Sequence, residues 1–201
     1  DVKNKYIRAL MFRLFENNGV LKRELVNDIV KSIKTDERKK IWELGIKIGR
    51  YHIYLPKMLK PKAVSLRISL WRLFYQLATD QNIPRSGLNY LIDKKYNKNF
   101  LLLCGFEKFK NHYVRIDILE KLFIKILNKT EKRKFKIDSE MMNLIGCNKE
   151  NFYSLMLSMN YKKSNEADTY FYTGETRRKN KFISVKKDEN PFKKLLNLNL
   201  K

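Results

Sequence analysis

The stretch Ile46-Lys47-Ile48-Gly49-Arg50-Tyr51-His52-Ile53-Tyr54-Leu55 departs from the helical spacing that precedes it. On each side of Gly49-Arg50, apolar and polar residues alternate with a period of two, which is typical of two short strands joined by a turn. The sequence therefore predicts a β-hairpin here. Pro56 ends this hairpin, and Pro61 suits the first turn of a helix that we expect to run to about Ala78.

Short helices are predicted before the hairpin. Apolar residues recur at helical spacing over residues 6–15, and Asn18-Gly19 suits a C-terminal stop. The same spacing over residues 21–33 predicts a second helix. A third helix is expected from Thr35, whose hydroxyl suits an N-cap, to about Leu44.

A helix followed by a hairpin recurs twice downstream. Candidate strands at 106–109 and 113–116 flank a polar turn at Lys110-Asn111, and candidate strands at 161–163 and 169–172 flank another. The predicted fold class is α+β, predominantly helical, with short helices and three helix–β-hairpin (winged-helix-like) units. Small α+β domains of other kinds contain the same elements, so this pattern leaves the function open.

The length of 201 residues fits one large domain or two small ones. We expect residues 1–79 to be a helical region with the first hairpin and the basic helix, and residues 80–87 to be a linker, since 82–87 are rich in turn-forming residues. Residues 88–175 are expected to hold two further helix–hairpin units. Residues 176–201 are predicted to be a basic, loose tail.

The chain carries 44 Lys and Arg against 21 Asp and Glu, a formal net charge of +23. Part of this excess is what an AT-rich coding sequence would produce, so the distribution is more informative. Residues 44–79 and 176–187 contain basic but no acidic residues. Lys and Arg neutralise phosphates and release counterions, which favours a nucleic-acid partner bound through its backbone. The predicted nucleic-acid-binding residues in these stretches are Lys47, Arg50, Lys57, Lys60, Lys62, Arg67, Arg72, Arg177, Arg178 and Lys179.

The helix that begins at Pro61 is expected to be chiefly a core element with basic residues at its margins. Its predicted apolar face consists of Ala63, Leu66, Leu70, Leu73, Phe74 and Leu77, and Val64, Ile68 and Trp71 widen this face. Aromatic residues beside the basic ones could stack on single-stranded bases or pack in the core, and both alternatives stay open. These residues are Tyr51, Tyr54, Trp71 and Tyr75.

Several kinds of site lack support in the sequence. No glycine-rich phosphate-binding motif is present, so this segment is not expected to bind or hydrolyse ATP. His52, His112, Cys104 and Cys147 lack the spacing of metal ligands, and the two cysteines form no disulfide framework. No apolar run approaches the roughly 18 residues of a membrane span, so we expect a cytoplasmic chain with no membrane partner. Because it opens at Asp1 without Met, we expect it to be cut from a longer protein.

Four blocks of sequence resemble a known family. They are similar to the region after the motor in alphaproteobacterial superfamily II ATP-dependent helicase-related proteins, which resemble the mitochondrial degradosome RNA helicase. The blocks occur in the family's order, and the resemblance covers the chain from about Tyr6 to Tyr172. They are 45–56 with Leu59-Lys60-Pro61, Leu66-Arg67 and Leu70-Trp71; Gly105-Phe106 with 114–120; Met141-Met142 with 144–147; and 157–161.

The resemblance implies an accessory region that binds RNA or DNA, with catalysis, ATP and Mg²⁺ in motor domains upstream of Asp1. It carries over no catalytic residue, so this segment alone is not expected to be an enzyme. Arg115, like Arg50, Lys60 and Arg67, matches a position that is basic in the family and joins the predicted contacts. Two alternatives remain: a free-standing winged-helix nucleic-acid-binding protein, and a protein-interaction module whose charge reflects coding bias.

Overall fold

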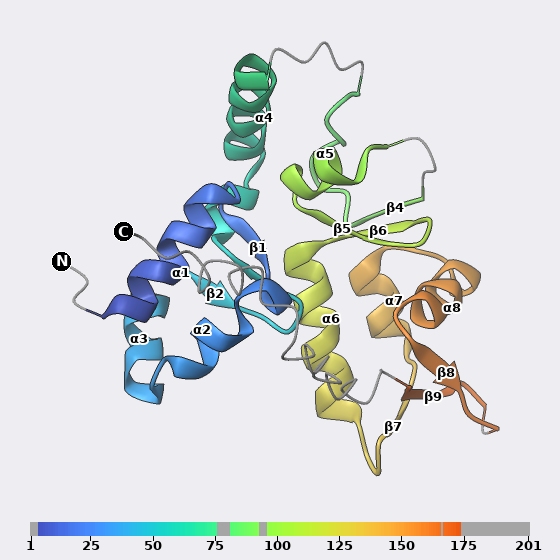
Figure 1. Cartoon of the computed structure of the whole chain (residues 1–201). Helices are drawn as coiled ribbons and strands as arrows, with labels where there is room; N and C mark the ends of the chain where they lie inside the picture. The colour runs from blue at the N-terminus through green and yellow to red at the C-terminus, as the bar shows by residue number, and fades with distance from the viewer. Residues whose placement is uncertain (1–3, 76–80, 93–95, 166, 174–201) are drawn as a thin grey trace, which may run out of the picture.

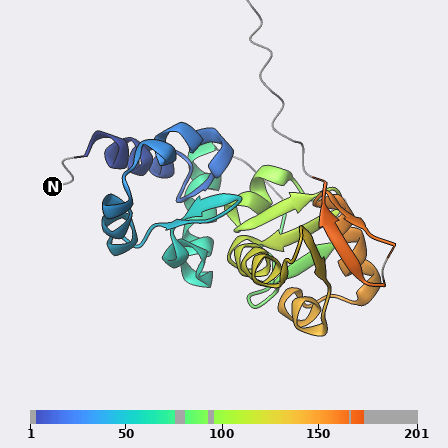
Figure 2. The ribbon, with the colours of Figure 1, turned by 90° about the horizontal axis from the view of Figure 1, so that it is seen from below.

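The computed structural model of the chain describes residues 4–75, 81–92, 96–165 and 167–173. These residues form three successive units, each with helices and a three-stranded antiparallel sheet, so the fold is α+β as expected. The first unit and the helix over residues 61–75 occupy one side of the molecule, and the rest of the second unit and the third unit occupy the other (Figures 1 and 2). The predicted tail residues Arg177, Arg178 and Lys179 lie outside the described residues.

The first unit confirms the hairpin at Gly49-Arg50. β2 and β3 are its two strands, and β3 lies in the middle of the sheet, antiparallel to both β1 and β2. Helix α1 ends at Glu16, and Asn18 and Gly19 just beyond it have φ angles of 54° and 81°, which turn the chain away from the helix as predicted. The elements are α1 (Lys5–Glu16), β1 (Val20–Lys22), the 3-10 turn η1 (Arg23–Val26), α2 (Asn27–Ser32), α3 (Thr35–Glu43), β2 (Lys47–Ile48) and β3 (His52–Tyr54).

The helix predicted over residues 21–33 is wrong at its start. Residues Val20–Lys22 form β1, and the α-helix begins only at Asn27. Leu21 pairs with Ile53 of β3 and is almost fully buried. Pairing with a distant strand has overridden the local preference, because a strand gains most of its stability from its neighbours in the sheet.

The second unit is built on β6, which lies between β4 and β5. Helix α4 packs on this unit, since its Val64 and Ile68 share a hydrophobic core with Phe100 and Tyr113. Residues 81–89 form neither helix nor strand, and the proposed linker at 80–87 stays a prediction. The elements are η2 (Pro56–Leu59), α4 (Pro61–Tyr75), β4 (Tyr90–Ile92), α5 (Lys98–Leu103), β5 (Phe106–Phe109) and β6 (His112–Arg115).

The third unit has the largest of the hydrophobic core clusters, built around Phe152, Leu155 and Tyr170. Its middle strand is β9, between β7 and β8. The expected hairpins at 106–116 and 161–172 are therefore confirmed, whereas the third strand of every sheet was missed. The elements are α6 (Ile116–Lys129), β7 (Lys134–Lys136), α7 (Ser139–Ile145), α8 (Lys149–Ser158), β8 (Tyr161–Lys163) and β9 (Thr169–Tyr172).

Short polar side chains start several of these helices. Asn97, Asp138 and Asn148 each accept a hydrogen bond from a backbone N–H in the first turn of α5, α7 and α8, at 2.8 to 2.9 Å. Such caps satisfy donors that a helix leaves open at its N-terminus. Gly146, with a φ of 78°, ends α7 in the left-handed region.

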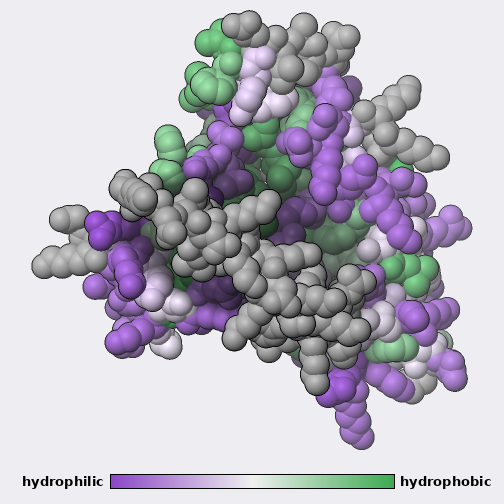
Figure 3. Space-filling model, viewed as in Figure 1, coloured by the Kyte–Doolittle hydropathy of each residue, from purple (hydrophilic) through white to green (hydrophobic). Residues whose placement is uncertain are grey.

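Helix α4 buries the margin of the predicted apolar face, at Val64 and Ile68, and leaves its centre exposed. Val64, Arg67 and Ile68 are buried, whereas Leu66, Leu70, Leu73 and Phe74 are 57–79% exposed. The face that packs is set by α5 and the second sheet, not by the number of apolar residues on the helix. In Figure 3, apolar residues gather at the top of the molecule, over α4. Among the described residues, no helix is long and apolar enough to cross a membrane.

Candidate nucleic-acid interface

The turn of the first hairpin is held by a carboxylate from α6. Glu120 is 6% exposed, and its two oxygens accept the backbone N–H groups of Arg50, Tyr51 and His52 at 2.5, 2.8 and 3.0 Å. A Cβ on Gly49 would lie 2.3 Å from the Glu120 carboxyl carbon, so only glycine fits this approach. The contact sets the position of the Arg50 and Tyr51 side chains relative to the third unit.

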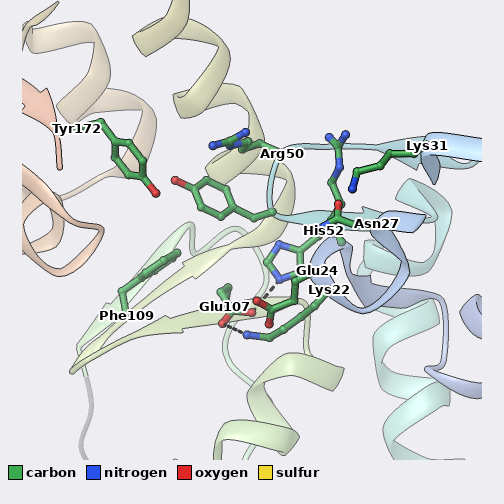
Figure 4. Close-up of a pocket in the computed structure, with 11 residues that line it drawn as sticks. Lys22, Glu24, Asn27, Lys31, Arg50, His52, Glu107, Phe109 and Tyr172 are labelled. Carbon is green, nitrogen blue, oxygen red and sulfur yellow. Dashed lines mark hydrogen bonds and ion pairs between the residues drawn. The ribbon is translucent and has the colours of Figure 1, made fainter. Parts of the chain in front are cut away.

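A second buried carboxylate joins β3 to β5. The Glu107 oxygens lie 2.8 Å from His52 Nε2 and 2.7 Å from Lys22 Nζ, as Figure 4 shows. Burial alone would raise the pKa of the Glu107 carboxyl, but the hydrogen bonds from His52 and Lys22 hold the pKa below its usual value. The pair of buried acids, Glu107 and Glu120, therefore attaches the first unit to the other two.

Because the folded state lowers the pKa of Glu107, its ionised form stabilises the fold above the ordinary carboxyl pKa, and this stabilisation is lost as the pH falls through the folded value. We expect Glu107→Gln to lower the free energy of unfolding by about 1–3 kcal/mol at neutral pH. The gap to the wild type should narrow below about pH 4.5. Urea denaturation at several pH values measures this gap. Glu24→Gln, a change at an exposed acid on the same cavity, should leave stability within about 0.5 kcal/mol.

A cleft runs past the hairpin turn and is formed by two adjoining cavities of about 540 and 410 Å³. Both cavities are lined by Arg50, Tyr51 and Tyr172, which come from the first and third units. Their volumes fall in the range of ordinary small-molecule pockets. The remaining lining residues are Lys22, Arg23, Glu24, Asn27, Lys31, His52, Glu107 and Phe109 in the first cavity, and Phe123, Ile126, Leu127, Thr130, Arg133, Phe135 and Tyr161 in the second.

The cleft carries an excess of positive charge. Five cationic side chains line it, against the two carboxylates of Glu24 and Glu107, and Glu107 is already paired with Lys22. Arg23 donates through one guanidinium nitrogen to Gly49 O at 2.7 Å, which fixes it beside the turn. Arg50 is exposed and lies 5.3 Å from the centre of the Phe123 ring. Such an arrangement attracts anions.

Aromatic rings line the same cleft. Tyr51 meets Phe109 and Phe123 edge to face, with ring centres 6.1 and 5.9 Å apart. Tyr172 is half exposed, and its ring centre lies 5.2 Å from that of Tyr161. Burial raises the pKa of the Tyr51 phenol far above its ordinary value, so this ring stays uncharged. Exposed aromatic faces beside guanidinium groups can stack unpaired bases.

Of the predicted binding residues that the structure describes, only one lines the cleft. Arg50 does so, whereas Lys47, Lys57, Lys60 and Lys62 are exposed elsewhere, outside its lining.

Three other arginines of the predicted binding set, Arg115, Arg72 and Arg67, bond to groups of the protein itself. Arg115 is paired with Asp117 through two hydrogen bonds. Arg72 donates to Gln81 O and lies over Phe100, and it is partly buried.

The predicted phosphate contact of Arg67 does not fit its place in the structure. Its guanidinium donates to Asn18 O and Leu103 O, and the residue is 5% exposed, so no face is open to a phosphate. These carbonyls lie just beyond α1 and at the end of α5, where helices leave acceptors unpaired. Arg67 therefore holds elements together.

Sequence reasoning missed most of the cleft. Lys22, Arg23 and Lys31 occur in a stretch of mixed charge that is typical of a solvated helix. Arg133 follows α6 in a segment that also contains acidic residues, so it belongs to no acid-free basic stretch. Tyr51 was one of the candidate stacking residues, but Tyr54 is buried. The only local signal was the glycine turn, because the cleft is assembled from segments more than a hundred residues apart.

No protein-family model, curated protein or solved structure matches this chain. Among the described residues, no three His, Cys, Asp or Glu side chains gather as a metal site requires.

Proposed function

We propose that this chain is an accessory, nucleic-acid-binding region of an ATP-dependent RNA or DNA helicase. The motor domains, with their ATP and Mg²⁺, would lie upstream in the same protein. The observation that carries the binding part of this proposal is the cleft, which is lined by Arg50 and four further cations and by Tyr51, Phe109 and Tyr172. Charge that meets phosphates and rings that stack bases are the two requirements for holding a single strand.

We also propose that the three units are winged-helix-like. In each sheet the last strand lies between the other two, and helices precede the hairpin. The first and third units share the order of helix, strand, two helices and hairpin, and in the second unit α5 lies between β4 and β5. In this arrangement the hairpins are the wings, and the first of them supplies Arg50 and Tyr51 to the cleft.

The charge of the cleft is tested by binding a labelled single-stranded RNA over a salt series. Lys31→Ala combined with Arg50→Ala removes two exposed cations, so we expect affinity to fall about 10- to 100-fold and the slope of log K against log salt to flatten by about 1.4. Lys39→Ala with Lys40→Ala removes the same charge from exposed positions on α3. The slope should stay unchanged in this control; an equal loss would mean that binding depends only on net charge.

The aromatic half of the proposal has its own readout. Tyr172→Ala removes a half-exposed ring and no charge, so affinity should fall roughly 5- to 100-fold while the salt slope stays that of the wild type. The bases of a duplex RNA of the same length are already stacked on one another. The Tyr172→Ala variant and the wild type should therefore bind this duplex with equal affinity. Wild-type protein without any salt-dependent RNA binding would favour the protein-interaction alternative.

A further inference from the structure

An apolar groove lies between the end of α1 and the outer face of α4. It has a volume of about 670 Å³. Phe15 forms one wall, and Leu66, Leu70, Leu73 and Phe74 form the other. These five side chains are 57–82% exposed. Among the residues that the structure describes, none lines both the groove and the cleft.

This surface is larger than a monomer normally leaves open. For side chains of this size and exposure, the five residues present on the order of 700 Å² of apolar area. The largest apolar patch of a typical monomer measures about 300–600 Å², and a stable protein interface buries about 800 Å² per partner. The exposed face is therefore close to the size of one half of a dimer interface.

The face also has the spacing of a helix–helix seam. Ala63, Leu66, Leu70 and Leu73 follow one another at intervals of three, four and three residues, and Leu77 continues the pattern in the sequence. This is the a/d spacing with which a helix packs along a second, similar helix. Ala63 and the three leucines line the groove together.

Charge indicates which partner fits. After Lys62, no charged residue on α4 within Pro61–Tyr75 is exposed: Arg67 is buried, and Arg72 is partly buried and bonded to Gln81 O. The exposed polar residues between the leucines are Ser65 and Ser69. The groove lining also includes one exposed acid, Glu16, which is paired with Arg13, so the face carries little net charge. In a chain of net charge +23, such a face does not attract nucleic acid or an acidic protein, and it adds no repulsion between two copies.

We propose that this face is the interface of a homodimer, in which α4 packs along α4 of a second copy. A two-fold axis would bring the leucine seam of one copy against that of the other, because a face that pairs with itself is self-complementary. Phe15 of each copy would cover the side of the seam. The dimer does not depend on nucleic-acid binding, since the cleft lies on other residues.

Sedimentation equilibrium of the full chain tests the proposal. The sample is treated with nuclease and kept at high salt, where bridging by nucleic acid is screened. We expect the mass to rise with concentration from 24.2 kDa to twice that value. Leu70→Glu combined with Leu73→Glu places four carboxylates in the paired seam and should weaken the dimer at least about 100-fold.

Two controls keep the test specific. Leu157→Glu changes a leucine of matching exposure, 54% against 57% for Leu70, on α8, and it should dimerise as the wild type does. Leu70→Cys should form a disulfide-linked dimer on oxidation, whereas Leu157→Cys should not. A wild-type chain that stays at 24.2 kDa up to about 100 µM, or a seam variant that still dimerises, would overturn the proposal. The RNA affinity of the Leu70→Glu, Leu73→Glu variant should be unchanged. Failure of the homodimer proposal can therefore be distinguished from failure of the proposed RNA binding in the cleft.

Discussion

Replacing Glu120 by alanine is expected to lower the free energy of unfolding by about 3–5 kcal/mol, the largest effect of any single change considered for this protein. The carboxylate accepts three backbone N–H groups, and Tyr51 and His52 are largely buried around it. Alanine would leave these three N–H groups without their protein acceptor. Thermal or urea denaturation followed by circular dichroism measures the loss.

The reason for this effect can be checked by pairing two substitutions. Gly49→Ala would drive a methyl group into the Glu120 carboxyl group and should itself be destabilising. In the Glu120→Ala background that clash is absent, so the two costs should not add, and a double-mutant cycle should give a coupling of about 1–3 kcal/mol. Glu140→Ala, at an exposed glutamate paired with Lys125, should cost less than about 1 kcal/mol. Additive costs would show that Glu120 does not act through the turn.

Replacing Arg67 by methionine is expected to cost about 2–4 kcal/mol. The side chain of methionine fills a similar space but cannot donate to the carbonyls of Asn18 and Leu103. Burial lowers the pKa of the Arg67 guanidinium below its ordinary value. The guanidinium group nevertheless stays charged, because arginine is a very strong base. Loss of this group should therefore loosen the packing of α1 against α4 and α5, and urea denaturation measures the change.

A matched change separates this structural role from mere loss of charge. Arg13→Met alters an exposed arginine on α1 that pairs with Glu16 three residues away, and its cost should stay below about 1 kcal/mol. Arg67→Lys keeps the charge but presents one nitrogen in place of the planar fork, so its stability should fall between those of wild type and methionine. If Arg67→Met were as stable as the wild type and bound RNA more weakly, the predicted phosphate contact would be restored.

Local patterns predicted the three hairpins because their cause is local. Alternation with a period of two and a turn-forming pair of residues are enough to define a hairpin such as β2–β3. Both signals lie within about ten consecutive residues. The strands β1, β4 and β7 were missed because each is three residues long and pairs with a strand far along the chain. No periodicity can be measured over three residues.

The sequence alone determined the α+β class, the helix before each hairpin, the helix stop at Asn18-Gly19 and the strongly basic composition, because each depends on neighbouring residues or on totals. The tertiary structure decided which surfaces are open. It buried Arg67 and exposed Leu70 on the same helix, and it brought Arg50, Arg133 and Tyr172 to one cleft. Burial and proximity depend on which elements pack together, and that packing is a property of the whole chain rather than of any stretch of it.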